Sequence, residues 1–376
     1  METDALDYHL PPELIATAPA EPRDAARLMV CDRATGRVSH HRVRDLPALG
    51  EAVGLPRAGD LLLVNHSKVV PARFFATRIE TGGKVEGLFL AEPEPMIWRV
   101  MFETRGRLRA GERVALKPGG PETPIDDTAV AAVLTLIEPL DGGVWRCELD
   151  PGGVGSDTWG VLDAVGSTPL PPYIRKARRT AGVDDESDDD RERYNTVYAE
   201  APGSVAAPTA GLHFTPRLLG ELDAMGVRRM AVTLHVGPGT LAPVRSKRLE
   251  EHAMHAEWIE VPDDVVRAIH EAREAGGRVL AVGTTTVRAI ESVSAESAAA
   301  GRGYLGPTSL FITPESGHAF RHTDALMTNF HLPRSTLLAM VAALPGVGLE
   351  RLMQWYREAI DAGYRFYSYG DAMVVV

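Results

Sequence analysis

The amino-acid sequence predicts an α/β protein that carries a separate all-β segment. Between residues 71 and 154, short β-type runs such as VWRCELD alternate with Gly and Pro turns, and no helical period is evident. Beyond residue 215, helix patterns and strand patterns alternate. The stretch 263–293 shows this best, because an apolar helical stripe is followed by two glycines, the buried-strand run RVLAV and a second helix. In such folds ligands bind at the loops that follow the carboxyl ends of strands.

The remaining elements follow from short patterns. LMVC and LLLV predict two apolar strands early in the chain, and VWRCELD predicts a strand with Trp145, Cys147 and Leu149 on one face. HLPRST precedes a predicted helix, LERLMQWYREAI predicts another, and DAMVVV predicts a final strand. The acidic run at 183–193 is interpreted as a solvated loop.

Composition excludes several classes of protein. The chain has 376 residues, of which 44% are hydrophobic and 24% charged, as expected of a packed soluble protein. No run approaches the ~18 apolar residues of a membrane span, and the start of the chain lacks a signal pattern, so we expect a complete, cytoplasmic protein without a membrane partner. The net charge of -11 argues against general coating of nucleic acid but leaves room for a local basic patch. Two cysteines are too few for a disulfide framework or a cysteine-rich zinc site.

Two stretches place a histidine beside small residues. GSVAAPTAGLHF, which ends in His213 and Phe214, is rich in residues that let backbone amides approach a ligand closely. A tight packing turn with a hydrogen-bonded core histidine explains it equally well. In TLHVGPGT, an apolar strand ends at His235 before a glycine turn, a position suited to acid–base chemistry.

A pair of histidines in EEHAMHAEW raises the question of a metal. His252 and His255 are three residues apart and Glu257 is close by. Zinc needs three or four ligands, and no further ligand set stands out. Proton transfer or polar packing is the favoured role, and no metal site is expected.

Two segments near the C-terminus combine polar and aromatic residues. DALMTNFHLPRST holds Asp324, Asn329 and His331 between apolar residues, where buried polar groups need partners. YRFYSYGDAM concentrates aromatic residues, including Tyr367, before Asp371, which suits stacking on a nucleobase or contact with a sulfonium cation. An aromatic cluster in the core is the alternative.

Taken in order, the motifs resemble one family. YHLPPELIATAPAEPRDAARLMV, GDLLLVNHSKVVPAR, GGKVEGLFL, LPPYIRK, RYNTVYAEAPGSVAAPTAGLHFT, VTLHVGPGTLAPV, HAMHAE, VLAVGTTTVRAIES, DALMTNFHLPRSTLLAMVAALPG and YRFYSYGDAMVVV are similar to the S-adenosylmethionine:tRNA ribosyltransferase-isomerase family of queuosine biosynthesis. The resemblance runs from Tyr8 to Val376. It implies a β/α-barrel-like catalytic domain (1–70 and 155–376) with an inserted small all-β barrel domain (71–154). The chain departs from the family pattern in NHSKV, RYN, GPGTL and TPESGHAF.

The resemblance also implies a reaction. The ribosyl moiety of S-adenosylmethionine is transferred and isomerised onto 7-aminomethyl-7-deazaguanine at the tRNA wobble position, giving epoxyqueuosine-tRNA, adenine and methionine. S-adenosylmethionine is then a donor substrate, tRNA is the macromolecular partner, no prosthetic group is needed, and the protein is expected to be a monomer. A base must remove a proton acidified by the sulfonium, and adenine needs an acid or a hydrogen-bond donor to leave.

We expect the three histidines His213, His235 and His331 to lie in one cleft with Asp324, Asn329 and Asp371. The small-residue loop before His213 is expected to hold the donor. Two alternatives stay open: a paralogue with the same donor but a free deazapurine as acceptor, and a binding protein without catalysis. Surface solubility is the alternative role of the arginines and lysine. The expected residues are, for catalysis, His213, His235, His331, Asp324 and Asp371; for substrate binding, Ser204, Ala207, Thr209, Gly211, Thr284, Asn329, Tyr367 and Tyr369; and for tRNA binding, Arg105, Arg107, Arg109, Arg175 and Lys176.

Overall fold

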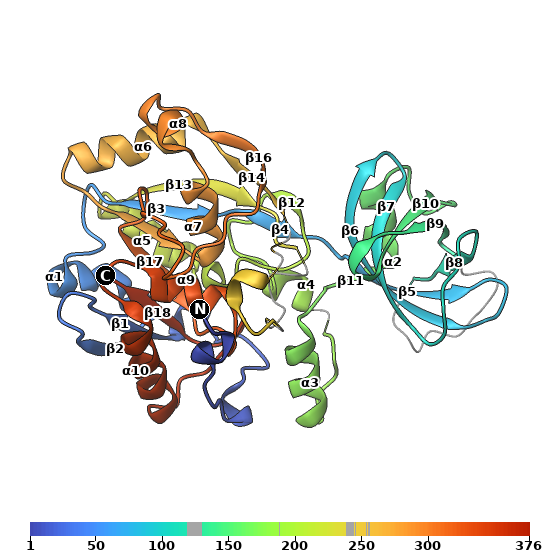
Figure 1. Ribbon diagram of the computed structural model, residues 1–376, viewed down its shortest axis with the longest axis horizontal. Helices are drawn as coiled ribbons and strands as arrows, with labels where there is room; N and C mark the ends of the chain where they lie inside the picture. Colours follow the sequence, from blue (N-terminus) through green and yellow to red (C-terminus); the bar gives the residue numbers. More distant parts are fainter. Residues whose placement is uncertain (119–129, 188, 238–243, 245, 253, 255) are drawn as a thin grey trace.

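A large mixed sheet forms the centre of the protein (Figure 1). The computed structural model describes residues 1–118, 130–187, 189–237, 244, 246–252, 254 and 256–376. Four neighbouring strands of this sheet run parallel, so their carboxyl ends meet at one edge. In spatial order the nine strands are β16 (Tyr304–Thr308), β14 (Glu257–Val261), β13 (Arg228–Leu234), β3 (Leu61–Asn65), β15 (Val279–Val282), β17 (Ala325–Asn329), β18 (Ala372–Val375), β1 (Arg27–Cys31) and β2 (Val38–Arg42), and the parallel four are β13, β3, β15 and β17.

Both faces of this sheet are covered, and side chains alternate between two hydrophobic cores. Leu61 and Leu63 of β3 enter one core, while Leu62 and Val64 enter the other. Burial on both faces explains why LLLV is a continuous apolar run and not an alternating one. The first core is closed by α6 (Asp263–Glu274), α7 (Thr284–Glu291), α9 (Thr336–Ala343) and α10 (Gly348–Asp361), and the second by α1 (Leu49–Val53), the 3-10 helix η4 (Val43–Ala48) and α5 (Pro216–Ala224).

The all-β segment is a closed six-stranded barrel, which stands apart from the main sheet in Figure 1. Its last strand pairs back with its first, so the barrel has no free edge. Cys147 and Leu149 point into its core as VWRCELD predicts, whereas Trp145 is only half-buried. The barrel order is β5 (Arg73–Arg78), β6 (Lys84–Glu94), β7 (Ile97–Thr104), β10 (Val144–Asp150), β9 (Ala132–Pro139) and β8 (Arg113–Leu116), with β11 (Gly166–Ser167) added to β5.

The mixed α/β class and the small β-barrel are therefore confirmed. The recorded pairings of the main sheet give an open order from β16 to β2, so its expected β/α-barrel-like form is not confirmed by them. Shorter elements lie along the chain where it enters and leaves the barrel: β4 (Ser67–Val69), α2 (Thr158–Val165), α3 (Pro172–Thr180), α4 (Asp190–Arg193) and β12 (Ala201–Ser204). Helix α8 (Ala295–Ala299) lies in the main part, between α7 and β16. Among the described residues, no single helix is long and apolar enough to span a membrane, and α9 with α10 meets that test only as a pair bent by 114°.

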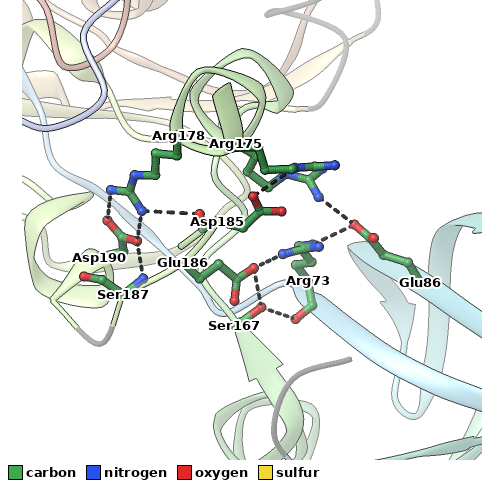
Figure 2. A network of polar contacts seen from close by, with 10 residues as sticks. Arg73, Glu86, Ser167, Arg175, Arg178, Asp185, Glu186, Ser187 and Asp190 are labelled. Atoms are coloured by element: carbon green, nitrogen blue, oxygen red, sulfur yellow. Dashed lines mark hydrogen bonds and ion pairs between the residues drawn. The ribbon is translucent and has the colours of Figure 1, made fainter. Parts of the chain in front are cut away.

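The prediction of a solvated loop for the acidic run 183–193 is only partly right, because most of its described residues are exposed but its end forms α4 and two of its carboxylates are engaged. Asp190 is buried and its carboxylate accepts two hydrogen bonds from the Arg178 guanidinium, at 2.6 and 2.8 Å. Glu186 forms an ion pair with Arg73 at the start of the barrel. Figure 2 shows this network, in which α3, the acidic run and the first barrel strands meet. The run therefore fastens the barrel to the rest of the chain.

Candidate active site

The carboxyl ends of the four parallel strands place several predicted site residues along one edge of the sheet. His235 directly follows β13, Thr284 follows β15 by one residue, and Asn329 ends β17. Strand β18 is antiparallel to β17 and pairs Ala372 with Asn329, so Asp371 lies at the same edge. The sequence predictions that a strand ends at His235 and that Thr284 follows the end of another strand are confirmed, whereas the end of a strand at Asn329 was not predicted.

A hydrogen-bonded cluster of His213 and Asn329 lies at this edge. The Asn329 side-chain amide nitrogen, Nδ2, donates to the Tyr367 carbonyl at 3.1 Å and lies 3.3 Å from His213 Nε2. Because a carbonyl can only accept, the amide nitrogen must face Tyr367, and Nε2 of His213 must then accept. This assignment leaves the His213 proton on Nδ1. Asn329 Oδ1 is buried and has no hydrogen-bond partner among the described residues, so it is an acceptor open to a ligand.

Burial controls the protonation of His213. The side chain is 4% exposed and lies on the 3-10 helix η7 (Thr209–His213). Desolvation lowers its pKa from 6.5 to about 4, against a smaller opposing effect of the Asp371 carboxylate. At neutral pH His213 is therefore a neutral imidazole, in which Nε2 accepts from Asn329 and the Nδ1–H can donate a hydrogen bond.

Asp371 holds the aromatic segment in place. Its carboxylate accepts hydrogen bonds from the backbone N–H of Arg27 and Arg365, at 3.0 and 2.8 Å, and from the Arg365 guanidinium at 3.1 Å. Tyr367 has a φ of 73° and its ring packs edge-on against Tyr173, with 4.8 Å between centroids. Asp371 thus shapes the turn whose carbonyl groups receive the Asn329 amide.

His331 lies on the other face of the sheet. Its Nε2 is 2.8 Å from Thr328 Oγ1, and its backbone N–H donates to the Tyr356 hydroxyl at 2.9 Å. Thr328 and Asn329 are consecutive strand residues and point to opposite faces. Burial lowers the pKa of His331 to about 3, so this imidazole is neutral as well. The structure does not bring His331 into contact with His213.

His235 is held at the far end of the edge. Its ring packs on Gly203, where an added Cβ would lie 3.1 Å from the ring, so a side chain at that position would displace the imidazole. Burial lowers the pKa of His235, and the electrostatic effect of the nearby His66 lowers it further. Three strand spacings of about 4.8 Å separate β13 from β17, so His235 and Asn329 are roughly 14 Å apart along the edge.

The small-residue loop is closely packed between these histidines. Ser204 Oγ donates to the Ala206 carbonyl at 2.7 Å and accepts from Val236 N–H at 2.9 Å, so its hydroxyl is engaged in the fold. Ala207 is buried, and Thr209 is half-buried at the start of η7. Gly211 is required by close approach, since a Cβ there would lie 2.2 Å from the Tyr198 hydroxyl. The packing-turn interpretation therefore holds for part of this loop.

Thr284 and Tyr369, both predicted to contact the substrate, lie in different parts of the structure. Thr284 is buried at the first turn of α7, and the next residue, Thr285, has a buried hydroxyl with no partner among the described residues. Such an end of a helix, with free N–H groups and a free hydroxyl, suits an anionic or hydroxyl group of a ligand. Tyr369 is 1% exposed and its hydroxyl lies 3.4 Å from Asp190, so it faces the acidic run.

Asp324 is not part of this edge. It precedes β17, five residues before Asn329, which places it roughly 17 Å away at the opposite end of the strand. Its carboxylate binds the Arg273 guanidinium at 2.8 Å and the backbone N–H of Val279 at 2.9 Å. Asp324 therefore links the starts of the parallel strands β15 and β17.

A cleft of about 740 Å³ lies between the barrel and the loop that precedes η7. Arg175 and Lys176 of α3 line it, as do Val205, Ala206 and Leu332, the residue after His331. Arg175 donates to Glu86 at 3.2 Å, whereas Lys176 is exposed. Its size and its mostly apolar walls with a few charged groups are typical of a site for a small molecule or a base.

Sequence reasoning missed Tyr173 and Arg73 in this cleft, and considered Glu86 only as a member of a β-rich segment for which surface ion pairing was a sufficient explanation. Tyr173 donates to or accepts from Ser368 Oγ at 2.5 Å, and Arg73 donates to Glu86 at 2.6 Å. Tyr173 and Glu86 occur in the quoted stretches LPPYIRK and GGKVEG, but nothing in their local patterns points to a shared cleft. Their proximity depends on how the barrel meets α3, which no local pattern encodes.

The predicted tRNA contacts Arg105, Arg107 and Arg109 are exposed in the turn that follows β7. Within the described part of the chain, no group of three or more His, Cys, Asp or Glu side chains is arranged to hold a metal ion. His255 lies outside the described residues, and Glu257 forms a buried ion pair with Arg288.

Comparison with known proteins identifies the family. Residues 3–375 match the family model described as "Queuosine biosynthesis protein". Proteins named S-adenosylmethionine:tRNA ribosyltransferase-isomerase are 47% identical in Thermus thermophilus (99% of both chains) and 44% identical in Gloeobacter violaceus (100% of this chain and 96% of the relative). The crystal structure of S-adenosylmethionine tRNA ribosyltransferase from Thermotoga maritima is 33% identical, with a TM-score of 0.52 over 99% of this chain and 100% of that one. The chain therefore belongs to the S-adenosylmethionine:tRNA ribosyltransferase-isomerase family of queuosine biosynthesis.

Proposed function

We propose that the protein transfers and isomerises the ribosyl moiety of S-adenosylmethionine onto 7-aminomethyl-7-deazaguanine at the wobble position of tRNA. The products are epoxyqueuosine-tRNA, adenine and methionine. The observation that carries this proposal is the match to relatives with that enzyme name over the whole length of the chain. S-adenosylmethionine is a substrate in this reaction, and the chemistry as proposed needs no metal ion or prosthetic group.

Within this proposal, the edge between His235 and Asn329 receives the donor. The open acceptor Asn329 Oδ1 is suited to a ribose hydroxyl or an amine N–H. His213, whose free ring nitrogen carries the proton in the assigned tautomer, is suited to hydrogen bonding with a leaving or attacking group. His235, roughly 14 Å along the edge from Asn329, and His331, on the other face of the sheet, would act on other parts of the two substrates and not on the same ribose atoms, and Asp371 acts as a positioning residue.

The cleft beside Arg175 is the proposed place for the acceptor base. A modified guanine must leave its stack to react, and pockets for such bases combine apolar walls with a few polar groups. The proposed domain division, 71–154 for the barrel and the remainder for a β/α-barrel-like catalytic domain, makes this cleft an interdomain site.

The departure from the family pattern in RYN falls on Asn195, whose amide binds the backbone of Val69 and Arg191. Its role is therefore structural, and no observation favours another acceptor.

Adenine release measures this function directly. The protein is incubated with S-adenosylmethionine and, separately, tRNA carrying the deazaguanine, unmodified tRNA, or the free base. Adenine formed with the modified tRNA alone is the expected result. Release with the free base would overturn the tRNA assignment, and retained binding of S-adenosylmethionine without release in any mixture would indicate a non-catalytic protein. His213→Ala should bind tRNA but release no adenine, whereas the exposed His9→Ala should match the wild type.

A further inference from the structure

A second hollow, of about 670 Å³, lies on the barrel itself. Its walls include the half-buried aromatic side chains of Phe102 on β7 and Trp145 on β10, and its rim includes Arg107 and Arg109. Phe102 also lines the cleft beside α3. The hollow and the cleft are therefore neighbours that share the Phe102 side chain.

The rim of the hollow carries free positive charge. Arg105, Arg107 and Arg109 are exposed, and none of them forms an ion pair with a described residue. In a chain with a net charge of -11, these three alternate arginines form a local positive patch. The carboxylate of Glu112 lies nearby, but it accepts a hydrogen bond from the Arg109 backbone N–H at 3.1 Å and pairs with the Arg78 guanidinium, and it forms no ion pair with the three exposed side chains. By contrast, four other arginines of the barrel each form an ion pair with a carboxylate: Arg73, Arg78, Arg113 and Arg146.

Arg78 holds the turn that presents these cations. Its guanidinium donates to the backbone carbonyls of Arg105, Gly106 and Arg107, each at 3.4 Å, and pairs with Glu112 at 3.3 Å. The Arg78 side chain is only 11% exposed. Because one buried guanidinium binds the carbonyl oxygens of the turn, its shape is fixed before any ligand arrives.

We propose that this hollow binds a single-stranded segment of the tRNA next to the reacting base. A base stacks against Trp145 or Phe102, because aromatic rings form sequence-tolerant platforms for bases. Phosphates of the same strand contact Arg107 and Arg109, whose planar guanidinium groups match phosphate geometry. Combined flat aromatic walls and unpaired cations fit a nucleic-acid strand better than a protein surface. This inference rests on the proposed function and adds the path of the RNA beyond the reacting base.

The test uses matched pairs of variants in the full-length protein. Arg107→Ala/Arg109→Ala is compared with Arg113→Ala/Arg146→Ala, which removes the same charge from ion-paired positions of the same barrel. Binding of a labelled anticodon stem-loop RNA is measured at several salt concentrations. We expect the first pair to raise Kd at least about tenfold. The slope of log Kd against log salt should fall by about 1.4, as for two lost single-strand phosphate contacts.

A second pair of variants tests the stacking. Trp145→Ala should raise Kd about 5- to 150-fold, the range for one base stacked on an aromatic ring. Trp159→Ala removes an exposed tryptophan of α2 that does not line the hollow, and should bind RNA as the wild type does. A duplex RNA of the same composition should bind equally to Trp145→Ala and to the wild type, since its bases are not available for stacking.

Several results would overturn the inference. They are equal Kd values for the two arginine pairs, an unchanged salt slope, or a loss of binding by Trp145→Ala that is as large with duplex RNA as with the stem-loop. Adenine release by the wild type with modified tRNA is recorded in parallel. If the wild type releases adenine while Arg107→Ala/Arg109→Ala binds normally, only the hollow assignment fails. If the wild type releases none, the proposed function fails, whatever the RNA binding shows.

Discussion

Acid should destabilise the folded protein through His213, and the effect can be calculated from its burial. The pKa of His213 is about 4 in the folded chain and 6.5 in the unfolded chain. The folded state therefore binds the proton more weakly. Its stability is unaffected by His213 above pH 6.5 and is lost as the pH falls from 6.5 to about 4. A difference of roughly 2.5 pH units at about 1.4 kcal/mol each gives a loss of roughly 3 kcal/mol.

The variant His213→Gln keeps a polar side chain beside Asn329 but cannot take up this proton. Between pH 6.5 and 4.5, its free energy of unfolding should fall less steeply than that of the wild type, by about 1.4 kcal/mol per pH unit. Urea unfolding followed by circular dichroism at pH 7.5, 6, 5 and 4.5 measures the slopes. His9→Gln, which alters an exposed histidine, is the control. Equal slopes for wild type and His213→Gln would refute the assignment of a neutral, desolvated imidazole at this position.

Three further substitutions test other parts of the structure. Asp190→Ala should lower the free energy of unfolding by about 3–5 kcal/mol, because it leaves the buried Arg178 cation without its partner. The double variant Arg178→Met/Asp190→Leu should recover most of this loss when both are measured by urea unfolding. An equal loss in the two variants would contradict the ion-pair reasoning. Gly203→Ala should reduce the rate of adenine release, since its Cβ would press on the His235 ring, and should also lower the melting temperature, because Gly203 has a φ of 133° that a residue with a side chain adopts only under strain; an unchanged rate in the folded variant would remove His235 from the site. Asp324→Asn should keep its rate of adenine release, and a loss of 100-fold or more would show that Asp324 takes part in the reaction.

The barrel could be predicted because its pattern is local. Alternation in VWRCELD places Cys147 and Leu149 inside, and only Trp145 differs, since it lines an open hollow near the end of its strand. The acidic run was misjudged in part, because the arginines that bind two of its carboxylates cannot be recognised from the sequence. Arg178 and Arg73 lie 12 and 113 residues from the carboxylates that bind them, and no local pattern links them.

The sequence motifs identified several side chains of the candidate site, but not how these side chains are arranged in space. His213 and Asn329 were both identified from their motifs, and they do meet. Asp324 and His331 come from the same motif as Asn329, yet the first lies at the other end of β17 and the second on its other face. The sequence DALMTNFH does not reveal where the strand begins, and that boundary decides which side chains share a surface.

The low pKa values of His213 and His331 suit the proposed donor. S-adenosylmethionine carries a permanent sulfonium charge, and an imidazolium nearby would repel it. Burial keeps both imidazoles neutral at pH 7, with pKa values of about 4 and 3, so this repulsion is absent. Neutral imidazoles are poor proton donors but offer one N–H and one lone pair each. Adenine should therefore leave by hydrogen bonding or through a proton delivered from the RNA or solvent side, and not by protonation from a pre-charged histidine at this edge.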